Sequence, residues 1–231
     1  MPDALEPFSP ATQQWFRNAF GTPTAAQEGA WESISKGENA LIIAPTGSGK
    51  TLAAFLWALD ALYRDKSAEP DQRELTTSTQ ARKNGDARET QKTKKQRAGG
   101  TRILYVSPLK ALGADVERNL RAPLAGIAHT AKESGRTPPD ITVGIRSGDT
   151  PARERRQLIS NPPDILLTTP ESLYLMLTSA ARSTLTGVTT VIVDEVHALA
   201  GTKRGAHPAV SIELTLIHIP EPTRRRRLKY A

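Results

Sequence analysis

The sequence predicts an α/β fold in which a parallel sheet is flanked by helices. Short β-rich apolar runs recur along the 231 residues, and each is followed by a polar or proline-marked turn and a helical stretch. This alternation is the rhythm of βαβ units in a parallel sheet. One run also leads straight into a glycine-rich turn, which is typical of a strand-to-helix connection that binds phosphate. The runs are residues 41–43, 102–107, 141–146, 164–169 and 188–193.

The first run enters a glycine-rich turn that closes on Lys50 and Thr51. In such a turn, successive backbone N–H groups point into one concavity, and the start of the following helix adds positive partial charge. The lysine supplies a point charge, and the threonine hydroxyl can bind magnesium. The apolar-rich stretch 52–62 predicts that helix. The sequence therefore predicts a nucleotide phosphate site made of Thr46, Gly47, Ser48, Gly49, Lys50 and Thr51.

The last run, residues 188–193, ends in Asp194 and Glu195. Acid pairs are common on solvated surfaces, so this pair gains its meaning from the apolar strand that precedes it. In a nucleotide hydrolase, the first acid holds magnesium, usually through water, and the second orients and deprotonates the attacking water. Lys50, Asp194 and Glu195 are therefore the candidate catalytic residues, and Thr51 and Asp194 are the candidate magnesium ligands.

The three middle runs also end in polar turns, and ligands of parallel sheets bind beyond the carboxyl ends of the strands. Backbone N–H groups at helix starts, together with lysine and threonine donors, suit the phosphates of a single strand. A simpler interpretation of residues 169–171 is helix capping. Both can hold, because the N–H groups of a capped helix start are a usual phosphate contact. The candidate nucleic-acid residues are Pro108, Lys110, Ser147, Gly148, Thr169 and Pro170.

Composition excludes several classes of site and locates the charge. The chain has no cysteine, and its four histidines show no ligand spacing with acids, so magnesium carried with a nucleotide is the one metal expected. No run approaches about 18 apolar residues, and the N-terminus lacks a signal-peptide profile, which predicts an intracellular protein without a membrane partner. The net charge is +7, but residues 64–100 and 219–231 each carry +4. The remainder is nearly neutral, so the overall charge is weak support for nucleic-acid binding.

Taken in order, these motifs resemble the superfamily 2 helicases of DExH type and, within them, the large helicase-related (Lhr) group. Residues 44–51 match the phosphate-loop form A-x-T-G-x-G-K-T of these helicases, in which alanine replaces the first glycine of the general pattern. The other matching segments are 20–27 with the adenine-reading Q motif, 107–112 with motif Ia, 168–173 with motif Ib, and 146–150 and 197–207 with segments of the Lhr group.

The resemblance implies a RecA-like P-loop NTPase fold, the first of two helicase domains, with ATP and Mg²⁺ as cofactors. Gln27 would read the adenine base, and the partner would be single-stranded nucleic acid, with DNA favoured over RNA or a hybrid. It also implies DNA repair in a bacterial-type cytoplasm at the nucleoid. One alternative is another P-loop ATPase, such as an AAA-type machine, which usually carries glycine at position 44 and lacks a counterpart of 168–173. The other is a non-catalytic module that binds nucleotide or nucleic acid.

The sequence divides into three predicted parts. Residues 1–36 form an N-terminal helical segment with the Q motif, residues 37–213 a RecA-like ATP-binding domain, and residues 214–231 an atypical tail that is unstructured or foreign. Within the second part, residues 64–100 hold almost no large apolar side chain beyond Leu75, which predicts a disordered insertion.

The tail departs from the family before motif III and before the second RecA-like domain, which in the resemblance supplies an arginine finger. Loss of an arginine finger costs a factor of about 10³–10⁵ in phosphoryl transfer. This chain alone is therefore expected to hydrolyse ATP weakly or not at all.

Overall fold

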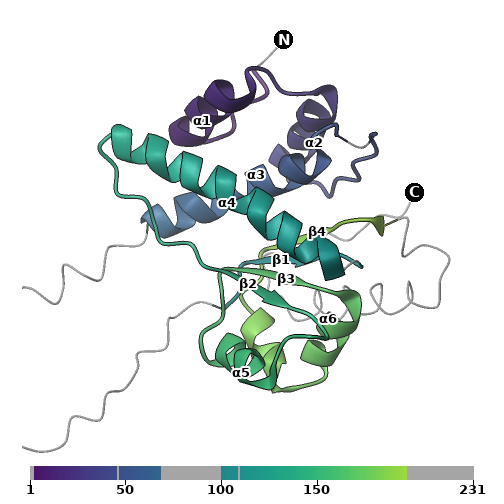
Figure 1. Cartoon of the computed structure of the whole chain (residues 1–231). Coiled ribbons are helices and arrows are strands. Elements are labelled where there is room, and N and C mark those ends of the chain that lie inside the picture. Colours follow the sequence, from purple (N-terminus) through teal and green to yellow (C-terminus); the bar gives the residue numbers. More distant parts are fainter. Residues whose placement is uncertain (1–2, 46, 69–99, 109, 197–231) are drawn as a thin grey trace, which may run out of the picture.

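The computed structural model describes residues 3–45, 47–68, 100–108 and 110–196 (Figure 1). Four strands form one sheet in the order β2-β3-β1-β4, and every neighbouring pair is parallel. The strands are β1 (Ile103–Val106), β2 (Val143–Arg146), β3 (Ile165–Thr168) and β4 (Thr190–Val193). The predicted parallel α/β fold is confirmed, and four of the five predicted runs contain a strand.

The register brings the carboxyl ends of all four strands to one edge of the sheet. Val106 of β1 lies beside Thr168 of β3 on one side and Val193 of β4 on the other. Arg146, the last residue of β2, lies beside Thr168 as well. The residues that follow each strand therefore emerge together, as the sequence predicted for the candidate site.

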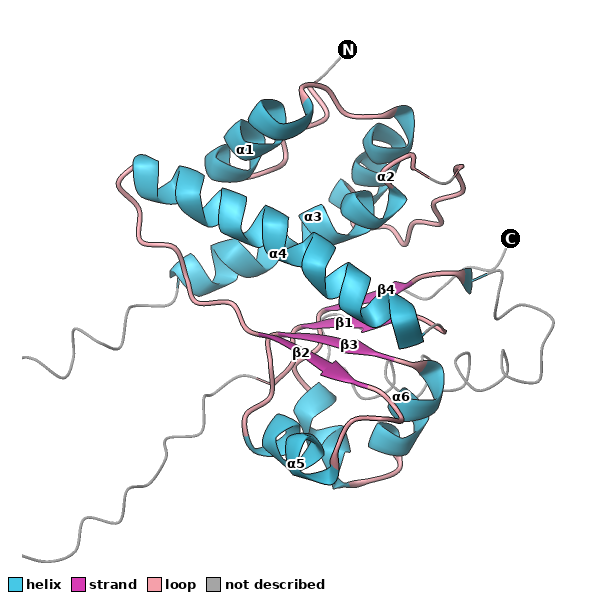
Figure 2. Ribbon diagram, viewed as in Figure 1, coloured by secondary structure: helices cyan, strands magenta, loops and turns pink. Residues whose placement is uncertain are grey.

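Helices cover both faces of the sheet (Figure 2). On one face lie α3 (Lys50–Ala68) and α4 (Lys110–Glu133), and on the other lie α5 (Ala152–Ser160), α6 (Pro170–Leu177) and the 3₁₀ helix η2 (Ala180–Leu185). Alternation along β1 explains the two layers: Ile103 and Tyr105 pack against α3 and α4, whereas Leu104 and Val106 pack against α6 and η2. β1 and β3 are fully buried because both of their faces are covered.

The N-terminal helices α1 (Pro10–Phe20) and α2 (Ala25–Ser35) pack on α4 and α3, on the side away from the sheet (Figure 1). Edge-to-face contacts of Trp31 with Phe8 and Phe16 form the centre of this layer, with ring centroids 4.8 and 5.5 Å apart. The indole N–H of Trp31 also donates to the carbonyl of Ala53 in α3 at 2.9 Å. α2 is thereby fixed to the helix that begins at the glycine-rich turn.

Residues 41–43 do not form the predicted strand. Leu41 is 74% exposed and Ile43 is 86% exposed. A strand needs a hydrogen-bonded neighbour, and within the described residues the sheet ends at β4, which pairs with β1 alone. Without such a ladder, and without helices over both faces, the apolar pattern of this segment does not produce a strand.

The predicted disordered insertion is also wrong at its start, because α3 continues to Ala68 and makes residues 64–68 helical. Ion pairs extend the helix: Arg64 pairs with Asp60, Asp65 with Arg102 at 2.8 Å, and Lys66 with Asp164 at 2.8 Å. Asp60 lies one turn earlier in α3, and Arg102 and Asp164 directly precede β1 and β3, so composition alone does not reveal these pairs. Residues 69–99 of the insertion and the predicted tail lie outside the described residues.

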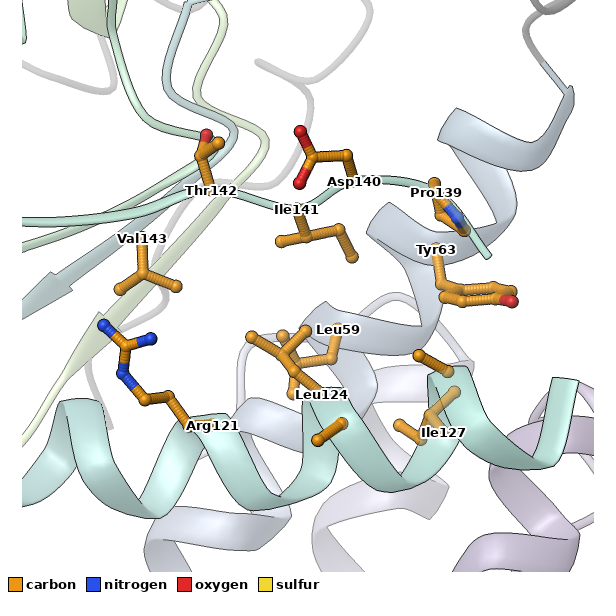
Figure 3. A pocket seen from close by; sticks show the side chains of 12 residues that line it. Leu59, Tyr63, Arg121, Leu124, Ile127, Pro139, Asp140, Ile141, Thr142 and Val143 are labelled. Atoms are coloured by element: carbon orange, nitrogen blue, oxygen red, sulfur yellow. The ribbon is translucent and has the colours of Figure 1, made fainter. Parts of the chain in front are cut away.

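A cavity of about 520 Å³ lies between α3, α4 and the segment that leads into β2 (Figure 3). Its walls are mainly apolar, with Leu59, Leu124 and Ile141 among the lining residues. It sits at the amino end of β2, and none of the predicted site residues lines it. Separately, no helix in the described part of the chain is long and apolar enough to cross a membrane.

Candidate nucleotide and nucleic-acid site

The glycine-rich turn has the backbone that a phosphate loop requires. Gly47 and Gly49 adopt φ values of 84° and 79°, a left-handed conformation that glycine takes without steric cost. α3 begins at Lys50, so Lys50 and Thr51 occupy its first turn. The ammonium of Lys50 folds back over the turn and donates to the carbonyls of Ala44 and Pro45. Thr46 lies outside the described residues.

The segment resembling the Q motif packs directly on this turn. Thr24 caps α2 and also donates from its hydroxyl to the carbonyl of Ser48 at 3.0 Å. The Gln27 side chain is 4% exposed, and its carbonyl oxygen accepts from the Thr24 N–H at 2.9 Å in a capping box. A Cβ on Gly49 would lie 2.5 Å from Nε2 of Gln27. Residues 24–27 and 48–49 are therefore in direct contact, and the φ of 79° at Gly49 favours glycine at this position.

The two acids follow β4 at the common edge of the sheet. The Asp194 N–H donates to the Val106 carbonyl at 2.9 Å, which continues the pairing with β1 by one residue. The carboxylate accepts from the Tyr105 hydroxyl at 2.5 Å and from the Glu195 N–H at 2.8 Å. Glu195 has a φ of 53°, an unusual left-handed conformation for a residue other than glycine. Such outliers cluster at functional sites.

Tyr105 connects the acids to the helix that follows the glycine-rich turn. Its ring is 1% exposed and stacks on Phe55 of α3, with centroids 4.9 Å apart. Burial raises the pKa of the Tyr105 phenol far above its usual value, and the hydrogen bond to Asp194 raises it further. The phenol therefore stays protonated and acts as a donor. α3 also packs against β4, and Phe55 lies in the second turn of α3, which links the early part of this helix to the acids through Tyr105.

The donors at this region fit magnesium. Thr51 offers a hydroxyl and Asp194 a carboxylate, and both are the hard oxygen donors that Mg²⁺ prefers. Among the described residues, no three His, Cys, Asp or Glu side chains are grouped as potential metal ligands. Mg²⁺ in nucleotide sites is usually bound by one or two protein groups together with phosphate oxygens and water.

The turn after β2 is held in shape by side chains. The Ser147 N–H donates to the Thr150 hydroxyl at 2.8 Å, and the Arg155 guanidinium donates to the carbonyls of Thr150 and Gly148, both at 2.7 Å. Each of these three bonds joins a side chain to a backbone group of the turn. The Asp149 N–H contacts the Ser147 hydroxyl at 3.3 Å. The turn thus presents a defined backbone at the edge of the sheet.

Helix capping by Thr169 is confirmed. Its hydroxyl accepts from the Ser172 N–H at 3.3 Å, and Pro170 occupies the first position of α6. Both side chains are buried, so any contact to a ligand here would come from backbone groups rather than from these side chains. Pro108 follows β1 and Lys110 begins α4, which places both at the same edge of the sheet; of Lys110 the structure describes the backbone alone.

Arg146 is a feature that the motif analysis named but gave no role. It is 8% exposed, and its Nη1 atom is buried without a hydrogen-bond partner in the described residues. Burial lowers the pKa of Arg146, and the nearby charge of Arg155 lowers it further. Arginine is effectively always protonated in proteins. A buried guanidinium with one nitrogen unsatisfied among the described residues therefore directly precedes the 147–150 turn in the chain, and a charged residue at the end of an otherwise apolar strand was the sequence signal for it.

Comparison with known proteins agrees with this geometry. Residues 24–228 match the family model described as DEAD/DEAH box helicase. The chain belongs to the DEAD/DEAH box helicase family. This helicase domain is 58% identical over 211 residues to the Lhr helicase/probable uracil glycosylase of Mycolicibacterium smegmatis, which covers 91% of the chain and 12% of that relative. It is 56% identical over 214 residues to the Lhr helicase/uracil glycosylase of Escherichia coli, covering 92% and 12%.

Solved structures place the fold in the same group. The structure of Mycobacterium smegmatis helicase Lhr bound to ssDNA and AMP-PNP matches with a TM-score of 0.78 and 54% identity, over 95% of this chain and 24% of that one. The DEAD-box helicase Mss116 bound to ssRNA and UDP-BeF matches with a TM-score of 0.65 at 15% identity, which concerns the fold alone. The sheet and its flanking helices are those of a RecA-like helicase domain.

Proposed function

We propose that this helicase domain is the first motor domain of an ATP-dependent helicase of the Lhr group, and that it binds Mg²⁺-ATP and single-stranded nucleic acid. This proposal rests on one observation: the segment that contains Gln27 packs on the glycine-rich turn at the start of α3. The same helix contacts Tyr105, which donates to Asp194. The packing of the Gln27 segment brings a candidate base-reading residue into direct contact with a candidate phosphate site. The AMP-PNP in the Lhr relative supports ATP as the nucleotide.

Each candidate residue has a defined part in this proposal. The N–H groups of residues 47–51 and the ammonium of Lys50 bind the phosphates, and Lys50 exchanges its present carbonyl partners for phosphate oxygens. Thr51 and Asp194 hold the magnesium ion, which neutralises phosphate charge. Glu195 orients the attacking water and accepts its proton. Gln27 offers an amide N–H to the adenine edge, since its carbonyl oxygen is engaged with Thr24.

The nucleic acid is proposed to lie along the edge formed by the turns after β1, β2 and β3. Because Thr169 and Pro170 are buried, the contacts there are to backbone N–H groups at the start of α6. Ser147 and Gly148 offer the backbone of a braced turn, and Arg146 adds positive charge at the residue before it. The ssDNA in the Lhr relative favours DNA as the partner. A cytoplasmic setting at the nucleoid is proposed from the similarity to bacterial Lhr helicases.

Catalysis needs more than this domain supplies. This chain spans 12% of the length of the two bacterial relatives, so their complete activities extend beyond it. The RecA-like partner domain of such helicases would supply the other wall of the ATP cleft. We therefore expect the isolated chain to bind nucleotide and nucleic acid while hydrolysing ATP slowly.

Lys50→Ala tests the nucleotide site. The intact chain is expected to gain about 2.7 kcal/mol of stability when Mg²⁺-ATP is present at about 100 times its dissociation constant. The variant should lose this gain, because the amine that faces the phosphates is absent. A thermal-shift titration measures both, with Lys36→Ala as control since Lys36 is an exposed residue paired with Glu32. No shift in the intact chain would contradict the proposal.

Arg146→Met tests the nucleic-acid edge. Methionine fills similar space without a charge, so the free energy of unfolding should stay the same or rise, because burying a charged group with an unsatisfied nitrogen is costly, and Nη1 has no partner in the described residues. Single-strand binding should weaken, and the slope of log affinity against log salt should fall by at most about 0.7, the value for one complete phosphate contact. Fluorescence anisotropy at several salt concentrations measures this.

The control is Arg156→Met, on the exposed side of α5. Equal salt slopes for Arg146→Met, Arg156→Met and the unchanged chain would remove Arg146 from the nucleic-acid site.

A further inference from the structure

The side chain of Tyr105 is surrounded by apolar residues, an environment in which phenylalanine would be expected. Tyr105 is on the face of β1 that packs against α3 and α4, together with Ile103, Ile165 and Leu167. A buried hydroxyl costs free energy unless it forms a hydrogen bond. Here it donates to Oδ2 of Asp194, 89 residues away in sequence and just beyond the neighbouring strand. The apolar layer thus contains one polar link to the acid pair.

This link holds the Asp194 carboxylate from one side while the backbone holds it from the other. Oδ2 accepts from Tyr105 at 2.5 Å, and Oδ1 accepts from the Glu195 N–H at 2.8 Å. With a fixed donor on each oxygen, rotation of the carboxylate would break both bonds. Each oxygen accepts more than one bond, so both retain capacity for a further ligand. The two hydrogen bonds therefore orient the Asp194 carboxylate and leave both oxygens able to bind a metal ion.

The Tyr105 ring itself is fixed. It stacks on Phe55, with an interplanar angle of 26°, and is 1% exposed. Phe55 lies in α3, the helix whose first turn carries Lys50 and Thr51. A movement of α3 would therefore reach Asp194 through two packed aromatic rings.

We propose that Tyr105 is a positioning residue, whose hydroxyl sets the orientation in which Asp194 receives the magnesium ion of the bound nucleotide. The proposal rests on the role of Asp194 in the proposed function. Groups that orient a metal ligand from outside the coordination shell commonly change metal affinity or activity by about 10–100-fold when they are removed.

Tyr105→Phe tests the proposal because it removes one oxygen and keeps the stacked ring. Binding of a non-hydrolysable ATP analogue is measured on the chain at a series of Mg²⁺ concentrations, and binding of ADP is measured in excess chelator. The variant is expected to need about 10-fold or more Mg²⁺ for half of the metal-dependent gain in affinity. Metal-free ADP binding should not change, since the phosphate turn is intact.

Tyr63→Phe is the matched control. Tyr63 is also a buried tyrosine on the α3 side of the sheet, but its hydroxyl has no hydrogen-bond partner in the described residues. Its removal should leave the Mg²⁺ dependence unchanged. Unfolding midpoints of both variants show whether they retain the fold.

The outcomes separate this inference from the proposed function. If Asp194→Asn shifts the Mg²⁺ dependence and Tyr105→Phe does not, the positioning role is wrong and the role of Asp194 stands. If neither shifts it, or if the chain binds no nucleotide, the proposed function itself fails. Equal weakening of metal-free and metal-dependent binding in Tyr105→Phe would indicate a packing defect and would also overturn the positioning role.

Discussion

Glu195→Gln is expected to slow ATP hydrolysis by about 10²–10⁴-fold and to leave nucleotide binding intact, in a protein that carries this domain together with a second motor domain. Glutamine has the same shape as glutamate but cannot accept the proton of the attacking water. Its backbone N–H still donates to Asp194, so the carboxylate that is proposed to hold magnesium keeps this support. Turnover is measured at saturating ATP and single-stranded DNA, and affinity is measured with a non-hydrolysable analogue.

The control for this variant is Glu154→Gln, an exposed acid in the first turn of α5. It removes the same charge away from the acid pair and should leave turnover unchanged. Near-normal turnover in Glu195→Gln would show that another group accepts the proton. It would also show that the left-handed conformation of Glu195 does not serve proton transfer.

Asp60→Ala is expected to lower the free energy of unfolding by about 3 kcal/mol, since it breaks a buried charged network. The Asp60 side chain is fully buried and accepts from the Ser9 N–H at 3.1 Å and from the Thr12 hydroxyl at 2.7 Å. It also pairs with Arg64. Removal leaves these donors without their acceptor at the junction of α1 and α3. Urea unfolding followed by circular dichroism measures the change.

Asp65→Ala provides the comparison, because Asp65 lies five residues further along α3 in a half-exposed pair with Arg102. Exposed ion pairs contribute at most about 1 kcal/mol. Similar losses for the two variants would show that the Asp60 network does not stabilise the fold as the geometry indicates.

Local chemistry predicted the parts of the fold in which neighbouring residues act on one another. The glycines at 47 and 49 permit a turn that few other residues could form. Thr169 caps α6 through a hydrogen bond to the N–H group three residues later, with Pro170 at the first helical position. The central strands β1 and β3 were found because burial on both faces leaves a continuous apolar run. The half-buried outer strands β2 and β4 were found from their β-rich composition and the turns that follow them.

The errors and omissions have the opposite cause. The run 41–43 has the pattern of a strand, but pairing requires a neighbour that the sequence does not display. The contact between Tyr105 and Asp194 depends on the register of β1 against β4, and the charge near Arg146 comes from Arg155 of α5. Such features arise from tertiary packing, which periodicity and motif spacing do not encode.

Among the residues that the structure describes, the outer edge of β4 lies at the end of the sheet, which bears on self-association. Within the described residues this strand is paired on one side, and N–H and C=O groups along an open edge can pair with another molecule. The exposed side chains of Leu41 and Ile43 add apolar surface that a second molecule could cover. Comparisons among variants are best made in dilute solution, with the molecular mass in solution checked for each.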